Sequence, residues 1–247
     1  MVTNPSTRPS FRHAFRQFLS KSDQAIGSGI NVPLLRGIVG VLGLVLPVVL
    51  VVWGFFILHG WHFFGSLSQY YSERTRDAFV GILFAIGCVL FAYNGYSKMD
   101  GYFGKAACIL AILVAVFPCT STDWQSTIHL VSACLLFVVF ALFSLVLFTK
   151  TKDSPQDFKG TIKSILLFGL SKQSLVMKSG KKRRNWIYRA CGIIILACLL
   201  VIGLYYWLWQ HTFLENTTFV LIMEWIMIWA FGFSWLVKSD IIPVLKD

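Results

Sequence analysis

The sequence predicts an all-α fold, a transmembrane bundle of six helices with both termini in the cytoplasm. Composition is the first observation, because hydrophobic residues make up 56% of the 247 residues and charged residues only 13%. A soluble domain usually carries about a quarter charged residues. The second observation is six apolar stretches, each long enough to cross roughly 30 Å of hydrocarbon at about 1.5 Å per residue. The third is the uneven distribution of Lys and Arg between these stretches.

The expected spans follow one another closely, except where one long basic loop separates the fourth from the fifth. The first span has glycine at every third position, at Gly37, Gly40 and Gly43. Small residues let another helix approach closely, so these glycines predict a helix-packing surface. Phe103–Cys119 is the shortest of the six. In order, the spans are Arg36–Leu58, Asp77–Ser97, Phe103–Cys119, Thr127–Phe148, Trp186–Trp209 and Thr217–Val237.

A single transmembrane domain over residues 36–240 accounts for most of the chain. Residues 1–35 form a basic cytoplasmic tail, in which apolar residues at helical spacing over Ser10–Ser20 predict a short amphipathic helix. A cytoplasmic loop over residues 149–185 carries ten Lys and Arg residues. Residues 241–247 form the C-terminal tail. We therefore expect no second folded domain.

The positions of Lys and Arg predict the orientation of the bundle. Of the 22 such residues, 20 lie on the side that holds both tails and the long loop. Only Arg74 and Arg76 lie on the other side. Because cytoplasmic segments carry the excess of Lys and Arg, both termini are expected in the cytoplasm.

The net charge of +11 has the same explanation and does not predict nucleic-acid binding. Basic segments beside a membrane attract anionic lipids. We therefore expect membrane lipids as partners, with anionic lipid headgroups at the cytoplasmic face. The six cysteines lie within or at the end of spans, so no disulfide framework is expected. The sequence makes no prediction of oligomeric state.

Ionisable residues near the outer ends of the spans are the candidates for catalysis. His129, Glu224 and Asp77 all fall there. Such residues are costly in lipid, so each needs a structural or functional reason. In one hypothesis the three converge as acid–base groups or as ligands of a zinc ion that activates water. In the other they pair with Arg76 or bond neighbouring helices. No helix carries two metal-ligand residues one turn apart, so we expect no metal site and no cofactor. A zinc ion is possible only under the first hypothesis.

Polar and aromatic residues at both ends of the bundle are candidates for ligand binding. The outer loop is rich in hydroxyl groups, and tyrosines suit the interface with lipid headgroups. At the inner end a tyrosine closes the second span and an arginine opens the fifth. The candidates are Arg76, Ser68, Tyr70, Tyr71, Tyr93 and Arg189. Ser68 lacks the Gly-x-Ser-x-Gly frame of a nucleophile elbow.

Several short runs resemble a group of bacterial six-helix membrane proteins. They are Arg-Asp-Ala-Phe-Val-Gly at 76–81, Tyr-Asn-Gly-Tyr at 93–96, Phe-Pro-Cys at 117–119, Ile-His-Leu-Val-Ser-Ala at 128–133, and the closing Glu-Trp…Leu-Val-Lys at 224–238. These runs are distantly similar to the Frag/DRAM/Sfk class, whose members are linked to lipid remodelling. The resemblance implies a multi-pass protein of a bacterial inner membrane.

Three functions are open at this stage. The leading hypothesis is an integral membrane protein that binds or handles a lipid in a polar pocket open to the outer leaflet. The first alternative is a membrane-embedded, metal-dependent lipid hydrolase, so whether the chain is an enzyme is left undecided. The second alternative is a small-solute or proton-coupled transporter in which Glu224 titrates. Neither an internal repeat nor a pair of interrupted helices supports transport.

Overall fold

The computed structural model describes residues 31–57, 59–60, 63–71, 74–95, 98–119, 124–150, 179–209 and 218–239. These residues form helices and turns, without strands. The expected amphipathic helix over Ser10–Ser20, most of the long basic loop and the C-terminal tail lie outside the described residues.

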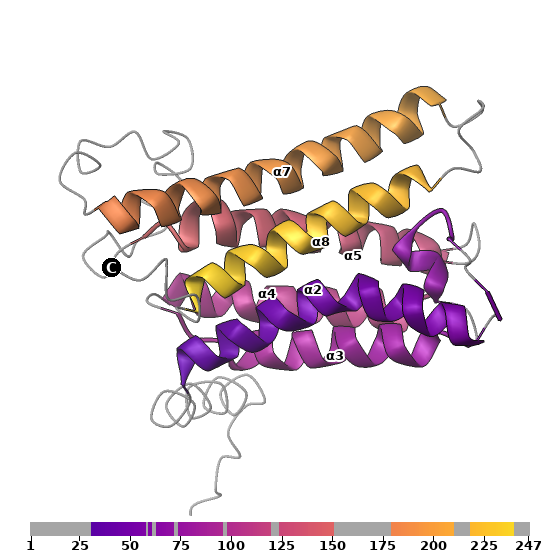
Figure 1. Cartoon of the computed structure of the whole chain (residues 1–247), viewed down its shortest axis with the longest axis horizontal. Coiled ribbons are helices and arrows are strands. Elements are labelled where there is room, and N and C mark those ends of the chain that lie inside the picture. The colour runs from indigo at the N-terminus through magenta and orange to yellow at the C-terminus, as the bar shows by residue number, and fades with distance from the viewer. Residues whose placement is uncertain are drawn as a thin grey trace, which may run out of the picture. The chain divides into compact units, whose positions relative to one another are not determined.

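Six long helices run alternately up and down the bundle (Figure 1). Each packs against the next in the chain, and the last returns to the first, so that the helices form a closed ring. Such a ring makes every neighbouring pair antiparallel. In order they are α2 (Val32–Ile57), α3 (Arg76–Ala92), α4 (Lys98–Val116), α5 (Trp124–Leu142), α7 (Ser179–Trp209) and α8 (Phe219–Lys238).

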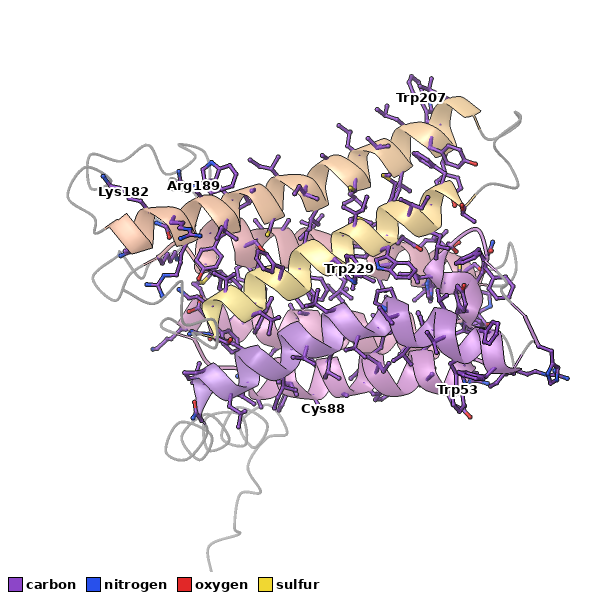
Figure 2. The ribbon with its side chains drawn as sticks, in the orientation of Figure 1. Trp53, Cys88, Lys182, Arg189, Trp207 and Trp229 are labelled. Carbon is purple, nitrogen blue, oxygen red and sulfur yellow. The ribbon has the colours of Figure 1, made fainter. Side chains whose placement is uncertain are left out.

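Two short elements complete the fold. A 3₁₀ helix, η1 (Leu67–Tyr70), lies between α2 and α3, and a π-helical turn, η2 (Phe143–Leu147), extends α5. The end of the bundle where α2, α4 and α7 finish is called the η1 end. Figure 2 shows Lys182 and Arg189 of α7 at the opposite end from Trp207.

Five helices are long and apolar enough to cross a membrane: α2, α4, α5 with η2, α7 and α8. The prediction of helices long and apolar enough to span a membrane is therefore confirmed for five of the six segments. The sixth, α3, has 17 residues and spans roughly 26 Å at helical rise. It ends at Ala92, because Tyr93 adopts an extended conformation, rather than at the predicted Ser97. Thus α3, and not the predicted Phe103–Cys119 segment, is the shortest, since α4 begins earlier, at Lys98.

The outer face of the ring carries many large apolar side chains. On α2, Val41, Val45, Val48 and Val52 are 39–49% exposed, whereas Leu46 and Leu50 are buried. The exposed residues recur at helical spacing and therefore line one face of the helix. An apolar outer face of this kind is expected for helices surrounded by lipid.

Glycines allow a close helix contact between α2 and α8. A Cβ atom on Gly232 would lie 2.8 Å from the Gly40 carbonyl oxygen and 3.0 Å from the Leu44 backbone nitrogen. A Cβ on Gly43 would lie 3.1 Å from the Phe231 ring. Two of the three predicted packing glycines, Gly40 and Gly43, thus lie at the contact with α8.

A similar contact joins α3 to α4. A Cβ on Gly104 would lie 2.6 Å from the Leu90 carbonyl oxygen, and one on Gly95 would overlap the Asp100 carboxylate. The buried side of α4 continues this small-residue surface with Ala107, Cys108 and Ala111. The helix α7 lies at the periphery of the bundle. Only 22% of its apolar stretch is buried, whereas the apolar stretches of the other four candidate spans are 44–56% buried.

The α2–α8 contact gives a first prediction. Gly232→Ala should lower the free energy of unfolding by about 1–3 kcal/mol, because the new methyl group meets backbone atoms that cannot move independently. Gly81→Ala is the matched control, since a Cβ there has nothing within 4 Å. It should leave stability unchanged or raise it by up to about 1 kcal/mol. Thermal unfolding of both variants in one detergent checks this, and equal effects would contradict the packing described.

Candidate functional site

The segment of residues 63–71, here called the η1 segment, turns into the η1 end of the bundle. Its nine residues include one glycine, two serines and four aromatic residues. Leu67, Tyr70 and Tyr71 are buried, with at most 6% of each residue exposed. Tyr70 packs against Gly54 of α2, where a Cβ would lie 3.2 Å from its ring, and edge-on against Phe64. These anchors place its backbone between α5 and α8.

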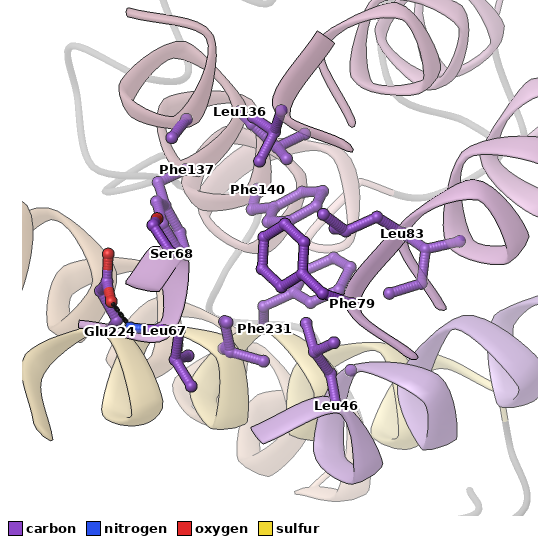
Figure 3. A pocket seen from close by; sticks show the side chains of 15 residues that line it. Leu46, Leu67, Ser68, Phe79, Leu83, Leu136, Phe137, Phe140, Glu224 and Phe231 are labelled. Atoms are coloured by element: carbon purple, nitrogen blue, oxygen red, sulfur yellow. Dashed lines mark hydrogen bonds between the residues drawn. The ribbon is translucent and has the colours of Figure 1, made fainter. Parts of the chain in front are cut away.

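Two backbone groups of the η1 segment bond to α8. The Leu221 N–H, which has no partner within the first turn of α8, donates to the Gly65 carbonyl oxygen at 2.8 Å. One turn further in, a Glu224 carboxylate oxygen accepts from the Leu67 N–H at 2.6 Å (Figure 3). Glu224, half-buried and roughly 8 Å along α8 from its start, therefore has a backbone partner at that depth.

Ser68 links the same segment to α5. The Ser68 hydroxyl lies 2.9 Å from Nε2 of His129, and Nδ1 of His129 lies 2.7 Å from the Phe117 carbonyl oxygen. The imidazole is fully buried and lies nearly parallel to the Phe79 ring, with centroids 6.5 Å apart. Both ring nitrogens thus have protein partners, and neither is left for a metal in this arrangement.

Tyr71 and Thr75 fix the end of the η1 segment. The Tyr71 hydroxyl donates to the Val116 carbonyl oxygen at 3.1 Å, and the Thr75 hydroxyl donates to the Tyr70 carbonyl oxygen. Burial raises the pKa of the Tyr70 phenol, and a backbone hydrogen bond from Phe64 partly offsets this. At Cys119, burial and then the charge of Glu224 raise the thiol pKa, so that this thiol stays protonated at neutral pH.

A cavity of about 590 Å³, counting its open mouth, lies inside the ring beneath the η1 segment (Figure 3). Residues of η1 and of every long helix except α7 line it. Among the described residues that line it, Ser68 and Glu224 are the only ones with polar side chains. The remaining lining residues are Gly43, Leu46, Leu67, Phe79, Leu83, Ile86, Val114, Ala133, Leu136, Phe137, Phe140, Ile228 and Phe231.

The structure brings some of the predicted site residues together and separates others. His129, Glu224, Ser68, Tyr70 and Tyr71 all contact or belong to the η1 segment. Asp77 and Arg76 are exposed at the start of α3, where the Arg76 guanidinium lies 5.0 Å from the centroid of the Tyr71 ring. Within the described part of the chain, no three His, Cys, Asp or Glu side chains gather as a metal site would require.

The other two predicted ligand-binding residues, Tyr93 and Arg189, lie at the opposite end. The Tyr93 hydroxyl accepts from the buried Arg36 guanidinium at 3.2 Å, and Arg36 also donates to the Lys238 carbonyl oxygen at 3.4 Å. The Lys238 ammonium donates to the Phe148 carbonyl oxygen at 2.8 Å. Arg189 is half-buried on α7. These bonds join α2, α3, η2 and α8 at that end.

Sequence reasoning missed three groups of residues. It counted Arg36, the first residue of the first predicted span, among the basic residues of the cytoplasmic side and assigned it no partner inside the bundle. It did not predict the π-helical turn at Phe143–Leu147. In this turn the Ser144 hydroxyl donates to the Ser234 hydroxyl at 2.9 Å. Nor did it identify the phenylalanines of the cavity. Phenylalanine is common throughout these spans, so no signal marks the ones that face inward.

No protein-family model, curated protein or solved structure matches this chain.

The bond between Glu224 and Leu67 gives a second prediction. Glu224→Ala should destabilise the protein by about 1–3 kcal/mol, because it leaves a backbone N–H without its acceptor. Glu224→Gln retains a side-chain oxygen that can accept the same bond, so it should unfold close to the wild-type temperature. Thermal unfolding of both variants checks this. Equal stability of Glu224→Ala and Glu224→Gln would contradict the role assigned to the carboxylate.

Proposed function

We propose that this chain is an integral membrane protein that binds an amphiphile, with the hydrocarbon chain in the cavity and the polar part at the η1 segment. One observation carries the proposal: 13 of the 15 residues that line the cavity are apolar, and the two polar ones are Ser68 and Glu224. Few polar groups on a mostly apolar wall are typical of small-molecule sites.

The composition of the wall favours a hydrocarbon chain over a polar solute. Four phenylalanines, Phe79, Phe137, Phe140 and Phe231, contribute large apolar surfaces, and Phe140 stacks on Phe231 with centroids 3.7 Å apart. Apolar surface offers nothing to replace the water lost by a polar solute. Lipids are also the molecules that surround helices of this kind. The pocket is thus more apolar than the polar pocket expected from the sequence.

The proposal includes an orientation. The η1 end faces the outer leaflet of a bacterial inner membrane and both termini are cytoplasmic. The asymmetry of Lys and Arg supports this, since α7 begins with the basic run Lys181–Arg184 at the opposite end. Anionic lipid headgroups are the expected partners of that run. Lys182 and Arg183 within it are exposed.

A third prediction tests the cavity as the binding site. Ala133→Phe should weaken binding of monooleoylglycerol by tenfold or more, because the phenyl group occupies cavity space that the acyl chain of the lipid needs. A tenfold loss corresponds to about 1.4 kcal/mol. Ala85→Phe is the control, since Ala85 is exposed on α3 and is not among the lining residues. Equilibrium binding of the labelled lipid to the full chain in mixed micelles measures both.

The proposal fails if the wild-type chain binds no monooleoylglycerol, or if folded Ala133→Phe binds it as tightly as Ala85→Phe does. Lipid that copurifies with the wild-type chain, identified by mass spectrometry, should also decrease in Ala133→Phe alone.

A further inference from the structure

We propose that Ser68 and His129 are a nucleophile and general base that cleave a carboxylic ester of a lipid whose acyl chain lies in the cavity. This inference rests on the proposed function, because the same cavity holds the substrate. It differs from the metal-dependent hydrolase considered from the sequence, since the attacking oxygen belongs to a serine of the chain.

The hydrogen bonds of His129 determine which ring nitrogen carries the proton. The Phe117 carbonyl oxygen can only accept, so in the neutral ring the proton lies on Nδ1, 2.7 Å from that oxygen. Nε2 then has a free lone pair. It accepts the hydrogen of the Ser68 hydroxyl at 2.9 Å.

This arrangement has the three parts of an activated nucleophile. A serine hydroxyl is bonded to an imidazole nitrogen that can take its proton, and a third group orients the imidazole. Here the third group is the Phe117 backbone carbonyl, whereas a carboxylate often has this role. The parallel ring of Phe79 also restricts the imidazole. No sequence motif surrounds Ser68, because the three groups come from separate parts of the chain. Ser68 lies in η1, His129 lies on α5, and Phe117 follows α4.

The position of Ser68 relative to the cavity supports a role in chemistry. Ser68 is one of the two polar lining residues, so its hydroxyl lies where the apolar wall meets polar groups. An ester bond at that boundary would place its acyl chain against the phenylalanines. The η1 segment is held to α8 by two other hydrogen bonds, at Gly65 and Leu67, so its docking does not depend on Ser68 alone.

The reaction needs only water, or a second alcohol, as co-reactant. The Ser68 oxygen attacks the ester carbonyl carbon and forms a new C–O bond while its proton passes to Nε2 of His129. The C–O bond to the alcohol portion then breaks, and Nε2 gives that proton to the departing oxygen. Water attacks the acyl–Ser68 ester, loses a proton to Nε2, and the proton returns to the Ser68 oxygen as the carboxylic acid leaves. With an alcohol in place of water, the product is a new ester.

The fourth prediction is that Ser68 reacts with a hexadecyl fluorophosphonate. This reagent forms a stable P–O bond to an activated serine and releases fluoride. The full-length wild-type chain should carry the adduct on Ser68, located by mass spectrometry of its peptides. Ser68→Ala should carry none. His129→Gln should react at least about 100-fold more slowly, because it lacks the base. Ser66→Ala is the matched control and should react as the wild type does, since the Ser66 side chain makes no capping hydrogen bond to η1.

The outcomes separate this inference from the proposed function. If the wild-type chain binds monooleoylglycerol but Ser68 acquires no adduct, the nucleophile is overturned and lipid binding stands. If it binds no lipid, the proposed function fails first. An adduct on Ser66 or another residue also overturns the inference, and this measurement on the wild-type chain decides even where Ser68→Ala does not fold. Hydrolysis of monooleoylglycerol that is unchanged in folded Ser68→Ala would overturn it as well.

Discussion

The hydrogen bonds that dock the η1 segment between α5 and α8 are the interaction on which the site depends. A carboxylate and an imidazole inside an apolar bundle are costly unless each has a partner. The Leu67 N–H supplies one for Glu224, and the Ser68 hydroxyl with the Phe117 carbonyl oxygen supplies two for His129. In return, Glu224 accepts a hydrogen bond from a backbone N–H of the η1 segment, and His129 bonds to a hydroxyl group of it. The segment is too short to provide partners for these groups from its own residues. The polar residues and the segment therefore require one another.

Helix packing explains why a cavity lies beneath that segment. Glycines bring α2 against α8 and α3 against α4 at close range, so the two pairs form compact walls. The ring must close through all six helices, and large side chains of α5 and α8 meet across its interior. The η1 segment covers one end of the remaining space. At the other end Arg36, Tyr93 and Lys238 join α2, α3 and η2 to α8 through hydrogen bonds.

The sequence predicted what depends on composition and missed what depends on side-chain direction. Long apolar runs predicted the helices because lipid leaves few alternatives for a backbone. They did so less well for α3, which ends at Ala92 because Tyr93 adopts an extended conformation. His129 and Glu224 stood out as ionisable residues near span ends, and Ser68 stood out as a hydroxyl residue of the outer loop. Their pairing could not be foreseen, because residues 61 positions apart meet only through the path of the η1 segment. Asp77 shared the same signal and is nevertheless exposed, since one helix position changes the face on which a residue lies.

Hydrogen–deuterium exchange of residues 66–71 tests the central claim most directly, with the full chain in lipid nanodiscs. Docking predicts that the Leu67 amide exchanges slowly, at a rate comparable with amides in the middle of α8, because Glu224 accepts its hydrogen and Leu67 is buried. Exchange of that amide at the rate of a solvated loop, while α8 remains protected, would contradict the account. In that case the η1 segment would not cover the cavity, and the site built on Ser68, His129 and Glu224 would not exist as described.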